Sequence, residues 1–518
     1  MDVLTISEML AEEKNVFSTG LTARALMEAA AEAMAVRIEA AYPDTRDFLL
    51  LVGKGNNGGD GLVVARRLME SGRNVRIVLT AAEDALGELP QSRLARLREA
   101  DPDVSVLPWG KNFPCPGADA VVIDALLGVQ AKGDLREPLA SAVAWLNAAR
   151  ASNFFRVVAL DLPSGLAAFE DQAAPENRDR AVVADLTLAV GFAKKLLVRE
   201  SLARWVGRLE VVPWSSEPSA SGPLQISLEP ELAGLLPRRN ALSHKNDFGR
   251  LAIVAGSPGF TGAAGLCTQA AQAMGAGLLS VVTRPEAAAI VASQAPHEAM
   301  VSGWADEGKI PGPVASASAI AIGPGLGKDA KALQMLRAAI GIGCPVVIDA
   351  DGLTVLSENM GLLREAKGPV LLTPHPGEMG RLIGRKFKPD ERETVARDFV
   401  EKHQVTLVLK GTRTLVSAPG KPLIVNTTGN AGLSTGGSGD TLTGMLGALL
   451  AQKLFPFDAA RLGVWLHGHA ADLVLAGRGC EEGLTPTMLS AHLGAALVSL
   501  RRRAVSAPGL IERARELP

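Results

Sequence analysis

The segment of residues 430–440 carries the clearest chemistry in the chain, because it places a phosphate cradle and an acid at one helix start. It reads Asn-Ala-Gly-Leu-Ser-Thr-Gly-Gly-Ser-Gly-Asp, and the apolar residues 441–450 predict a helix that begins near Gly437. Glycines let backbone N–H groups approach an anion closely, and the helix dipole favours negative charge there. Asp440 would then act as a base on a hydroxyl while the N–H groups hold the phosphoryl group under attack. The alternative, a glycine-rich helix start with an ordinary first-turn acid, fits a shorter segment better.

A second glycine-rich segment, residues 53–61, follows an apolar run of residues 48–52 that predicts a buried strand. It reads Gly-Lys-Gly-Asn-Asn-Gly-Gly-Asp-Gly and formally fits the dinucleotide fingerprint, although the next predicted strand, residues 75–80, lacks the acid that holds a ribose. A tight strand-to-helix turn explains the glycines but not the paired asparagines. The distinctive residues are Asn56, Asn57, Gly58, Gly59 and Asp60, which offer two amides and a carboxylate as oxygen ligands.

Two further predicted strands end on carboxylates. Asp124 ends one strand, and Asp161 ends another with Ser164 three residues later. Strand-end aspartates often only cap the next helix, which is the alternative for each of them. If the strands are neighbours, these side chains converge with Asn57 on one crevice, where such oxygens suit a hard cation. With one or two carboxylates available, a monovalent ion fits.

Length and composition set the class of the protein. A chain of 518 residues is too long for one core, so two domains are expected. A formal charge of −2 and a pI near 6.4 argue against nucleic-acid or membrane binding. Four scattered cysteines fit reduced thiols and a cytoplasmic protein, and no apolar run reaches membrane-spanning length. His467 and His469 lack a supporting carboxylate or cysteine cluster, which argues against a transition-metal site.

A Pro/Ser-rich stretch predicts the domain boundary: a first domain at residues 1–213, a linker at 214–223 and a second domain at 224–518. Strand-like runs alternate with helical segments on both sides, which predicts an α/β fold of mostly parallel sheets with helices on both faces. Ligands should bind beyond the carboxyl ends of the strands. The expected strands are residues 48–52, 75–80, 120–125, 156–160 and 185–190, then 251–255, 278–283, 319–323, 345–348 and 370–373, with 406–410 and 414–417 adjacent.

An ordered series of motifs carries a family resemblance over nearly the whole chain. The first half resembles the Rossmann-like NAD(P)H-hydrate epimerase domain, through Leu-Met-Glu at 26–28, the Asn-Asn-Gly-Gly-Asp segment, Asp-Ala-Leu-Leu-Gly at 124–128 and Asp-Leu-Pro-Ser-Gly at 161–165. The second half resembles the ribokinase-like NAD(P)H-hydrate dehydratase domain. Its motifs include His-Lys at 244–245, Thr-Gly-Ala-Ala at 261–264, Gly-Pro-Gly-Leu-Gly at 323–327, Asp-Ala-Asp-Gly-Leu at 349–353, Thr-Pro-His-Pro-Gly-Glu at 373–378 and Lys-Gly-Thr at 410–412. Fusion of the two domains is typical of the bifunctional nicotinamide-nucleotide repair enzymes.

The first half departs from the family pattern in its loops. Residues 167–171 read Ala-Ala-Phe-Glu-Asp where the family has Asp-Ala-Asp-x-Gly. The loop at 128–138 resembles the longer form of animal members, and Lys194 lacks the Pro-Gly that follows it in the family. In the second half, Asn246 replaces a usual glycine. The departures concern loop geometry more than strand-end residues.

The resemblance implies a role for each motif of the first domain. The substrates are NADHX and NADPHX, in which the reduced ring has taken up water at C6. Asn57, Asp124 and Ser164 would bind potassium, and Asp161 would transfer the proton when the two epimers exchange. The hydrate would be held by Asn56, Asn57, Gly58, Gly59, Asp60, Gly128, Val129, Gln130, Ala131, Lys132, Gly133, Asp134 and Asp161.

In the second domain the resemblance implies that a nucleotide phosphorylates the hydroxyl of the S-hydrate and that loss of phosphate restores NAD(P)H. ADP with Mg²⁺ is the expected donor, ATP the alternative, and assembly as a homo-oligomer is compatible with the family. Asp440 would be the base and would contact the hydrate with Ala263, Gly325 and His375, the last of which could instead be a rigid-turn residue. The nucleotide would be bound by Lys410, Gly411, Thr412, Arg413, Thr414 and Gly439, although Lys410 could be a surface hairpin lysine.

Two other classes of function remain open from the sequence. The glycine-rich site with Asp440 also serves ribokinase-like kinases of small vitamin alcohols, which would accumulate a phosphorylated alcohol. The first half could be a non-catalytic binding module that keeps only the fold. The presence of Asn57, Asp124, Asp161 and Ser164 favours catalysis in that half.

Overall fold

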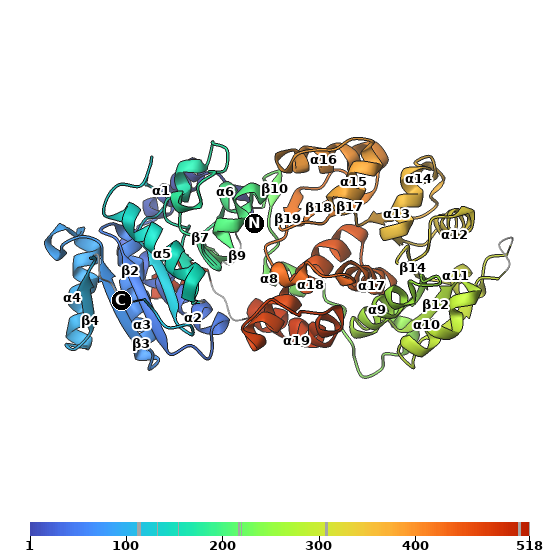
Figure 1. The fold of residues 1–518 in the computed structure, drawn as a ribbon, viewed down its shortest axis with the longest axis horizontal. Coiled ribbons are helices and arrows are strands. Elements are labelled where there is room, and N and C mark those ends of the chain that lie inside the picture. The colour runs from blue at the N-terminus through green and yellow to red at the C-terminus, as the bar shows by residue number, and fades with distance from the viewer. Residues whose placement is uncertain are drawn as a thin grey trace. The chain divides into compact units, whose positions relative to one another are not determined.

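The computed structural model describes residues 1–110, 115–131, 133–153, 155–215, 218, 220–305, 309–505 and 509–516. The chain divides into two compact units (Figure 1). The first runs from Met1 to Gly222 and includes the C-terminal helix α20 (Leu510–Glu516), and the second runs from Pro223 to the end of α19 (Pro486–Val505). No helix in the described ranges is both long and apolar enough to cross a membrane.

The first unit is built on a seven-stranded parallel sheet. Its order is β4 (Ser105–Pro108), β3 (Asn74–Leu79), β2 (Asp47–Val52), β5 (Val121–Ala125), β6 (Arg156–Leu160), β7 (Leu186–Gly191) and β9 (Arg208–Pro213). All five residues of β5 are buried, as expected for a parallel strand covered on both faces. Because β2, β5 and β6 are neighbours, the polar residues that follow them meet at one edge of the sheet.

Helices cover both faces of this sheet. Side chains of α5 (Leu139–Asn153) join alternate residues of β2, β5 and β6, among them Leu49, Val122 and Val157, in one hydrophobic cluster. On the other face α3 (Asn56–Glu70) packs closely, since a Cβ on Gly61 would lie 2.5 Å from Cβ of Ala125. The remaining helices include α1 (Ile6–Ser18), α2 (Ala23–Ala41), α4 (Glu88–Ala100), α6 (Lys195–Val198) and α7 (Ala203–Val206).

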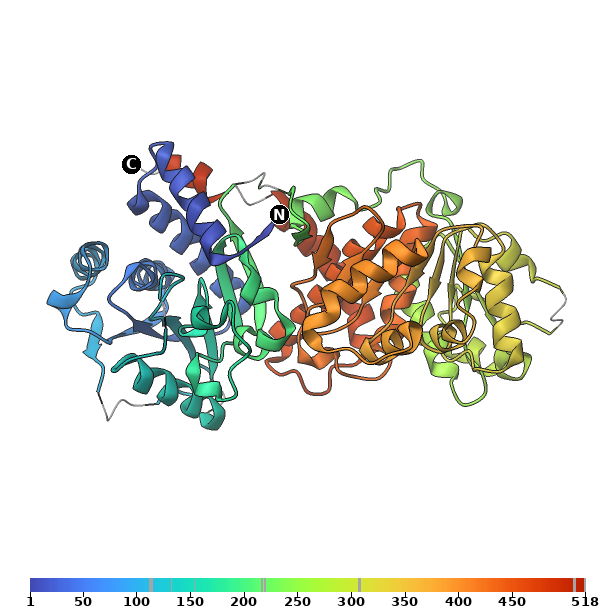
Figure 2. The same ribbon diagram turned by 90° about the horizontal axis from the view of Figure 1, so that it is seen from above.

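Short elements at the chain ends complete the first unit. The N-terminal β1 (Val3–Leu4) pairs in parallel with β8 (Ala193–Lys194). Helix α20 packs against α2 (Figure 2), and the N–H of Ile511 donates to the carbonyl of Trp214 at 2.7 Å. The sequence assigned all of residues 224–518 to the second domain, and for α20 this is wrong. Its apolar side is buried on the first unit, where Leu510 is 1% exposed and Ala514 3% exposed.

The second unit contains a ten-stranded mixed sheet. Its order is β10 (Leu224–Gln225), β19 (Leu423–Val425), β18 (Leu415–Ser417), β17 (Thr406–Leu409), β16 (Val370–Leu372), β15 (Val346–Ile348), β14 (Ala319–Ile322), β11 (Arg250–Val254), β12 (Leu278–Thr283) and β13 (Met300–Gly303). All pairs are parallel except β17–β18 and β18–β19. The predicted α/β fold with two domains and the adjacent strands β17 and β18 are therefore confirmed.

Helix α17 (Ser438–Ala451) is the centre of the second unit's core. Every residue from Thr441 to Ala451 is buried, because α17 packs on β11, β14 and β15 and also contacts α9 (Thr261–Ala273), α18 (Pro456–Arg478) and α19. Figure 1 shows α15 (Pro376–Ile383) and α16 (Arg392–His403) away from this group of helices. The other helices include α8 (Glu229–Gly234), α10 (Ala288–Gln294), α12 (Ala330–Ile340) and α13 (Ala350–Ser357).

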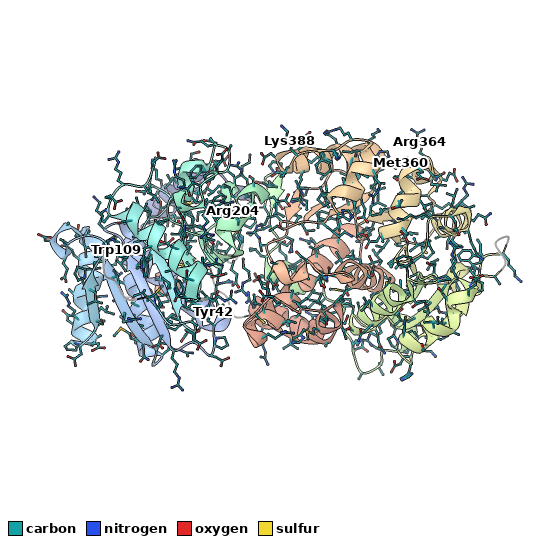
Figure 3. The ribbon with its side chains drawn as sticks, viewed as in Figure 1. Tyr42, Trp109, Arg204, Met360, Arg364 and Lys388 are labelled. Atoms are coloured by element: carbon teal, nitrogen blue, oxygen red, sulfur yellow. The ribbon has the colours of Figure 1, made fainter. Side chains whose placement is uncertain are left out.

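The few aromatic side chains mainly support packing. Trp109, labelled in Figure 3, meets Trp145 of α5 edge-on with ring centroids 5.5 Å apart, and both pack against the hydrophobic cluster of the first unit. The guanidinium of Arg204 stacks 4.0 Å from the ring of Trp205 in α7. Tyr42, the single tyrosine of the chain, follows α2 and donates its backbone N–H to Ile38.

Candidate functional sites

Three polar residues meet at the carboxyl end of the first sheet. Oδ1 of Asp124 accepts hydrogen bonds from Oγ of Ser164 at 2.6 Å and from the N–H of Leu126 at 3.2 Å, while Oδ2 accepts from the N–H of Ser164 at 2.8 Å. Leu127 links them to Asn57: its carbonyl accepts from Nδ2 of Asn57 and its N–H donates to Oγ of Ser164, both at 2.9 Å. The structure therefore brings together the three residues expected at a cation site.

The same cluster contains an acceptor that lacks a protein donor. Oδ1 of Asn57 is buried and has no hydrogen-bond partner among the described residues. Burial raises the pKa of Asp124 to about 6 although bonds from Ser164 and Leu126 lower it. An unpaired amide oxygen beside a buried carboxylate fits a hard cation, which would compensate both. No group of three His, Cys, Asp or Glu side chains suited to a metal ion gathers within the described ranges.

Asp161 occupies a special backbone position directly after β6. Its φ of +67° is uncommon for a residue other than glycine, and such backbone conformations often mark functional sites. Its carboxylate forms an ion pair with the fully buried Lys194 and accepts the N–H of Val190 at 3.2 Å. Lys194 also donates to the carbonyl of Val190 at 2.7 Å, so the ammonium is fixed beside the carboxylate.

Two more carboxyl groups lie within electrostatic range of Asp161. Burial raises the pKa of Asp60 well above its usual value, and the charges of Asp161 and Glu13 raise it further. Burial and the charge of Asp161 likewise raise the pKa of Glu13, while Lys194 lowers it. Sequence reasoning missed Glu13, because Glu12 and Glu13 are adjacent acids and only the placement of α1 shows which one approaches the site.

The glycines of the Asn-Asn-Gly-Gly-Asp segment are required by close packing. The first turn of α3 begins at Asn56, and a Cβ on Gly58 would lie 2.0 Å from the carbonyl oxygen of Gly53. A Cβ on Gly59 would lie 3.0 Å from Met27. This backbone geometry brings Asn57 and Asp60 to the sheet edge.

The loop of residues 128–134 starts beside Asn57, since a Cβ on Gly128 would lie 3.5 Å from Cβ of Asn57. Ala131 closes a turn onto Gly128 at 3.1 Å, and Asp134 forms an ion pair with Arg180. Val129, Gln130 and Gly133 lie in this partly exposed loop, and the predicted substrate residue Lys132 lies outside the described residues.

The unusual loop of residues 167–171 fastens the N-terminal helix. Oε1 of Glu170 accepts the N–H of Ile6, the first residue of α1, at 2.6 Å. Arg199 donates to the carbonyls of Phe169, Glu170 and Gln172 at 2.9, 3.1 and 3.0 Å, which holds this loop in place. The departure from the family pattern therefore supports the helix that carries Glu13.

In the second unit, α17 begins as the sequence predicts, with Gly437 at the N-cap and Asp440 in the first turn. Gly437 has φ of +92°, and a Cβ there would lie 2.6 Å from Leu266. The first amides of a helix lack partners within it, so those at Gly439 and Asp440 are suited to an anion. Burial, followed by the charge of Asp349, raises the pKa of Asp440 to about 7.

Lys410 lies at this helix start. Its Nζ is 2.8 Å from Oδ1 of Asp349 and 3.8 Å from Oε2 of Glu378, and it would lie 3.4 Å from a Cβ on Gly439. Burial lowers the pKa of Lys410, but the charges of Asp349 and Glu378 outweigh burial and raise it. The site thus holds a charged ammonium beside Asp440, which excludes an exposed hairpin position for Lys410.

His375 is the N-cap residue of α15, and its side chain is about half exposed. Its Nδ1 accepts the N–H of Gly377 at 3.0 Å, and its own N–H donates to Glu378 at 2.8 Å. The residue therefore fixes a turn, as one interpretation expected, while its exposed ring leaves Nε2 3.5 Å from Oε1 of Glu378. Glu378 was part of a recognised motif but was not assigned a role from the sequence.

Ala263 and Gly325, which were both predicted to contact the hydrate, lie next to each other in the structure. Gly325 has φ of +58°, and a Cβ there would lie 3.3 Å from Cβ of Ala263 and 2.6 Å from the carbonyl oxygen of Phe260. Ser257 donates to the carbonyl of Gly325 at 2.7 Å and fixes the two loops together. Phe260 is an exposed aromatic residue next to this pair.

The loop between β17 and β18 contains Gly411, Thr412, Arg413 and Thr414. The side chain of Arg413 is buried, and burial lowers its pKa to about 10 although the charge of Asp472 raises it. Its guanidinium is thus engaged inside the protein, so a nucleotide contact from Arg413 would come from its backbone.

Two residues that sequence reasoning did not assign support the second site. Arg392 donates to the carbonyls of Leu409 and Lys410 at 3.1 and 3.2 Å and so fixes the end of β17. Nε2 of His467 lies 3.0 Å from the carbonyl oxygen of Ser438. A carbonyl only accepts hydrogen bonds, so Nε2 carries the proton, and burial lowers the pKa of His467 to about 4 and keeps it neutral.

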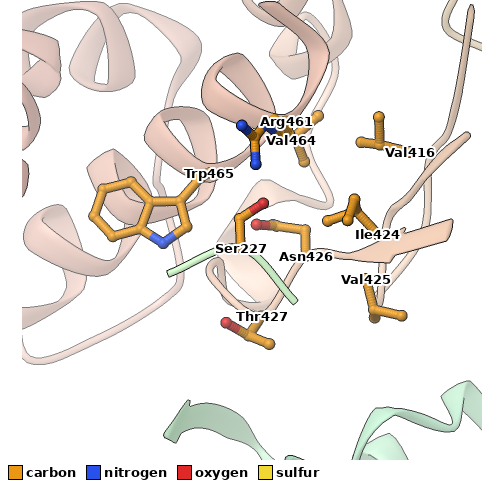
Figure 4. Close-up of a pocket in the computed structure, with 9 residues that line it drawn as sticks. All are labelled: Ser227, Val416, Ile424, Val425, Asn426, Thr427, Arg461, Val464 and Trp465. Atoms are coloured by element: carbon orange, nitrogen blue, oxygen red, sulfur yellow. The ribbon is translucent and has the colours of Figure 1, made fainter. Parts of the chain in front are cut away.

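A small cavity lies elsewhere in the second unit (Figure 4). It measures about 10 Å³, which is room for about one water molecule. Oγ of Ser227, which lines it, is buried without a hydrogen-bond partner in the described structure. The cavity is too small for a substrate. Its lining residues are Ser227, Val416, Ile424, Val425, Asn426, Thr427, Arg461, Val464 and Trp465.

Comparison with known proteins places both units in one family. Residues 23–196 match the family described as YjeF-related protein N-terminus, and residues 251–494 match NAD(P)H-hydrate dehydratase. The bifunctional NAD(P)H-hydrate repair enzyme Nnr of Coxiella burnetii is 34% identical over 501 residues, covering 95% of this chain and 99% of the relative. The protein of the same name from Escherichia coli K12 is 35% identical over 483 residues, covering 92% and 89%.

The chain belongs to the family of bifunctional NAD(P)H-hydrate repair enzymes. Among solved structures, it is similar to an ADP/ATP-dependent NAD(P)H-hydrate dehydratase from Bacillus subtilis co-crystallised with ATP and Mg²⁺. The identity is 31%, with 53% of this chain and 98% of that chain covered and a TM-score of 0.47. Since the relatives that match across both units are bifunctional repair enzymes, a kinase of a small vitamin alcohol with a non-catalytic N-terminal binding module is not favoured.

Proposed function

We propose that the chain repairs hydrated nicotinamide nucleotides, with epimerisation of the R- and S-hydrates in the first unit and dehydration of the S-hydrate in the second. The observation that carries this proposal is the position of Lys410, paired with Asp349, beside the glycine-rich start of α17 that contains Asp440. A cation, free amides and a base with a pKa of about 7 suit phosphoryl transfer to a hydroxyl. Family membership supplies the substrate class.

In the first unit, Asn57, Asp124 and Ser164 would hold a potassium ion. The positive charge of the ion would balance the carboxylate of Asp124, and Oδ1 of Asn57 would be one of its ligands. Binding would thereby stabilise the first turn of α3. Asn56 to Asp60 and the loop of residues 128–134 would bind the hydrate next to Asp161. This assignment rests on the hydrogen-bonded cluster and on the unpaired buried oxygen of Asn57.

Asp60 and Asp161 are suited to opposite proton transfers, because their environments differ. Asp60, whose pKa is raised by burial, gives a proton to the C6 hydroxyl, and the C6–O bond breaks to release water as the ring nitrogen forms a C=N bond. Water then adds to the other face, and Asp161, which is ion-paired with Lys194, takes the proton that this water loses. Return of that proton from Asp161 to Asp60 resets the site.

In the second unit, Lys410, the loop to Thr414 and Gly439 bind the magnesium complex of ADP, with ATP as the alternative donor. Ala263, Gly325 and His375 contact the hydrate. Asp440 takes the proton of the C6 hydroxyl as its oxygen bonds to the terminal phosphorus and AMP leaves. Phosphate then departs with the C–O electron pair, and loss of a proton from C5 restores the dihydropyridine ring.

The test is to incubate the full chain with chemically hydrated NADH, adding ADP or ATP, and to follow recovery of the reduced-nicotinamide absorbance. The expected result is absorbance that returns with release of inorganic phosphate, and faster with ADP. Accumulation of a stable phosphorylated alcohol, without recovery of absorbance, would replace this proposal with the kinase alternative.

A further inference from the structure

Asp349 stands at a position where an aspartate ordinarily caps its own helix. It follows β15 and is the N-cap residue of α13, yet its side chain accepts no hydrogen bond from that helix. The next residue, Ala350, has φ of +49°, an uncommon value outside glycine. A carboxylate turned away from its own helix, at a strained turn, has a role other than local capping.

Both oxygens of Asp349 instead bind other elements of the second-unit site. Oδ1 lies 2.8 Å from Nζ of Lys410 at the end of β17, and Oδ2 accepts from Oγ1 of Thr443 in α17 at 2.7 Å. Oδ2 would lie 3.6 Å from a Cβ on Gly439, the residue before Asp440. One side chain thus connects β15, β17 and the first turns of α17.

The exposed fractions of Asp349 and Lys410 indicate that the Lys410 ammonium is open to a ligand on one side. The side chain of Asp349 is 1% exposed, whereas that of Lys410 is 21% exposed. A buried carboxylate is costly unless it is paired and hydrogen-bonded, and Lys410 with Thr443 supplies both. An ammonium has three N–H donors, so after its bond to Asp349 it keeps donors for an anion on its open side.

We propose that Asp349 is a positioning residue for phosphoryl transfer: it holds the Lys410 ammonium at the start of α17 so that Lys410 meets the transferring phosphoryl group beside Asp440. The inference rests on the proposed function of this site and adds a residue to which that function assigns no contact with substrate. Asp349 acts through Lys410 and through its charge.

The charge of Asp349 also acts on Asp440. After burial, it is the largest influence that raises the pKa of Asp440 to about 7. Replacing the carboxylate with an amide would therefore lower that pKa, so Asp440 would act as a base at lower pH. The other titratable groups facing this region are Asp351 on α13, Glu378 on α15, Lys410 after β17, Cys267 on α9 and His467 on α18.

The experiment compares Asp349→Asn with the near-isosteric control Thr443→Val in the full chain, using S-hydrate and the magnesium complex of ADP. Asp349→Asn should raise KM for ADP and lower kcat/KM by about 10–100-fold, because Lys410 loses its anchor. In a plot of kcat against pH, the acidic limb of this variant should move to lower pH by about one unit. Thr443→Val removes the hydrogen bond to Oδ2 of Asp349 without changing the charge of the site. The acidic limb of its kcat profile should therefore lie at the same pH as that of the wild type.

A second variant separates charge from placement. Asp349→Glu keeps the charge but moves the carboxylate, so it should keep the wild-type acidic limb and still raise KM for ADP; it also provides the test if Asp349→Asn does not fold by thermal melting. Wild-type KM and pH profile in the folded Asn variant, or wild-type KM in the Glu variant, would overturn the role of Asp349. A wild-type chain that does not convert S-hydrate would instead refute the proposed function itself.

Discussion

Ser164 holds both oxygens of the Asp124 carboxylate, with Oγ donating to Oδ1 at 2.6 Å and the backbone N–H donating to Oδ2 at 2.8 Å. Because Asp124 lies in β5 and Ser164 follows β6, these bonds join the carboxyl ends of two neighbouring strands. They lower the pKa of Asp124, but burial prevails and raises it to about 6. The carboxylate is thus an incompletely compensated buried anion.

Potassium should stabilise the protein in a pH-dependent way. The pKa of Asp124 is raised from its unfolded value, so its ionisation costs folding stability progressively as pH rises from about 4 to about 6. A cation at Asn57, Asp124 and Ser164 binds the ionised form, so its gain in melting temperature should grow through this range and level off above it. The measurement is thermal melting with potassium chloride against tetramethylammonium chloride at pH 5 and pH 7.5. Asp124→Asn, the control, should abolish the difference between the salts; an equal potassium effect in this variant would contradict the site.

Asp161→Asn should abolish exchange between the hydrate epimers while leaving cation binding intact. The amide cannot accept the proton that Asp161 takes, and it leaves the buried ammonium of Lys194 without its counter-charge. The measurement is chromatographic conversion of purified R-hydrate to S-hydrate by the full chain, in an Asp440→Asn background that prevents dehydration. The potassium-dependent melting shift serves as the control for an intact cluster. Exchange at the parent rate would remove Asp161 from the chemistry.

Asp440→Asn should lower dehydration by about 10²–10⁴-fold while nucleotide still binds, because shape is kept and the base is lost. Wild-type kcat should rise with pH up to about 7 and then level off, since the carboxylate form is the active one. Turnover of S-hydrate gives the rate, titration with ADP gives the binding, and epimer exchange in the first unit should be unchanged. An undiminished rate would exclude Asp440 as the base.

The cluster in the first unit could be predicted from the sequence because parallel strands place their carboxyl ends together. Asn57 follows β2, Asp124 lies near the end of β5 and Ser164 follows β6, so their convergence could be predicted on the condition that these strands are neighbours, as they are in the structure. The start of α17 at Gly437 is foreseeable too, because glycines precede an apolar helical run. In both cases the pattern of residues along the chain agrees with the position that these residues have in the fold.

Other features depend on packing that no local pattern encodes. Nothing in residues 510–516 indicates that α20 returns to α2 of the first unit. Asp349 belongs to a motif that the sequence shows, but its pairing with Lys410 and Thr443 depends on the packing of β15, β17 and α17, which are far apart in the chain. The sequence predicted that Arg413 binds the nucleotide. Its side chain is buried in the second unit, and the local sequence does not indicate this burial.

Loss of the Glu170 contact should loosen α1 and slow epimer exchange. Oε1 of Glu170 accepts the N–H of Ile6 at 2.6 Å, and a carboxylate at a helix start also gains from the helix dipole. Glu170→Ala should therefore cost about 0.5–2 kcal/mol of local stability, as loss of a helix cap does, and should release the helix that carries Glu13. Hydrogen exchange of the α1 amides measures the loosening, and conversion of R-hydrate to S-hydrate measures its effect on activity. Asp171→Ala, which removes the exposed neighbouring charge, should leave both unchanged, and equal exchange protection of α1 in the two variants would show that Glu170 does not hold this helix.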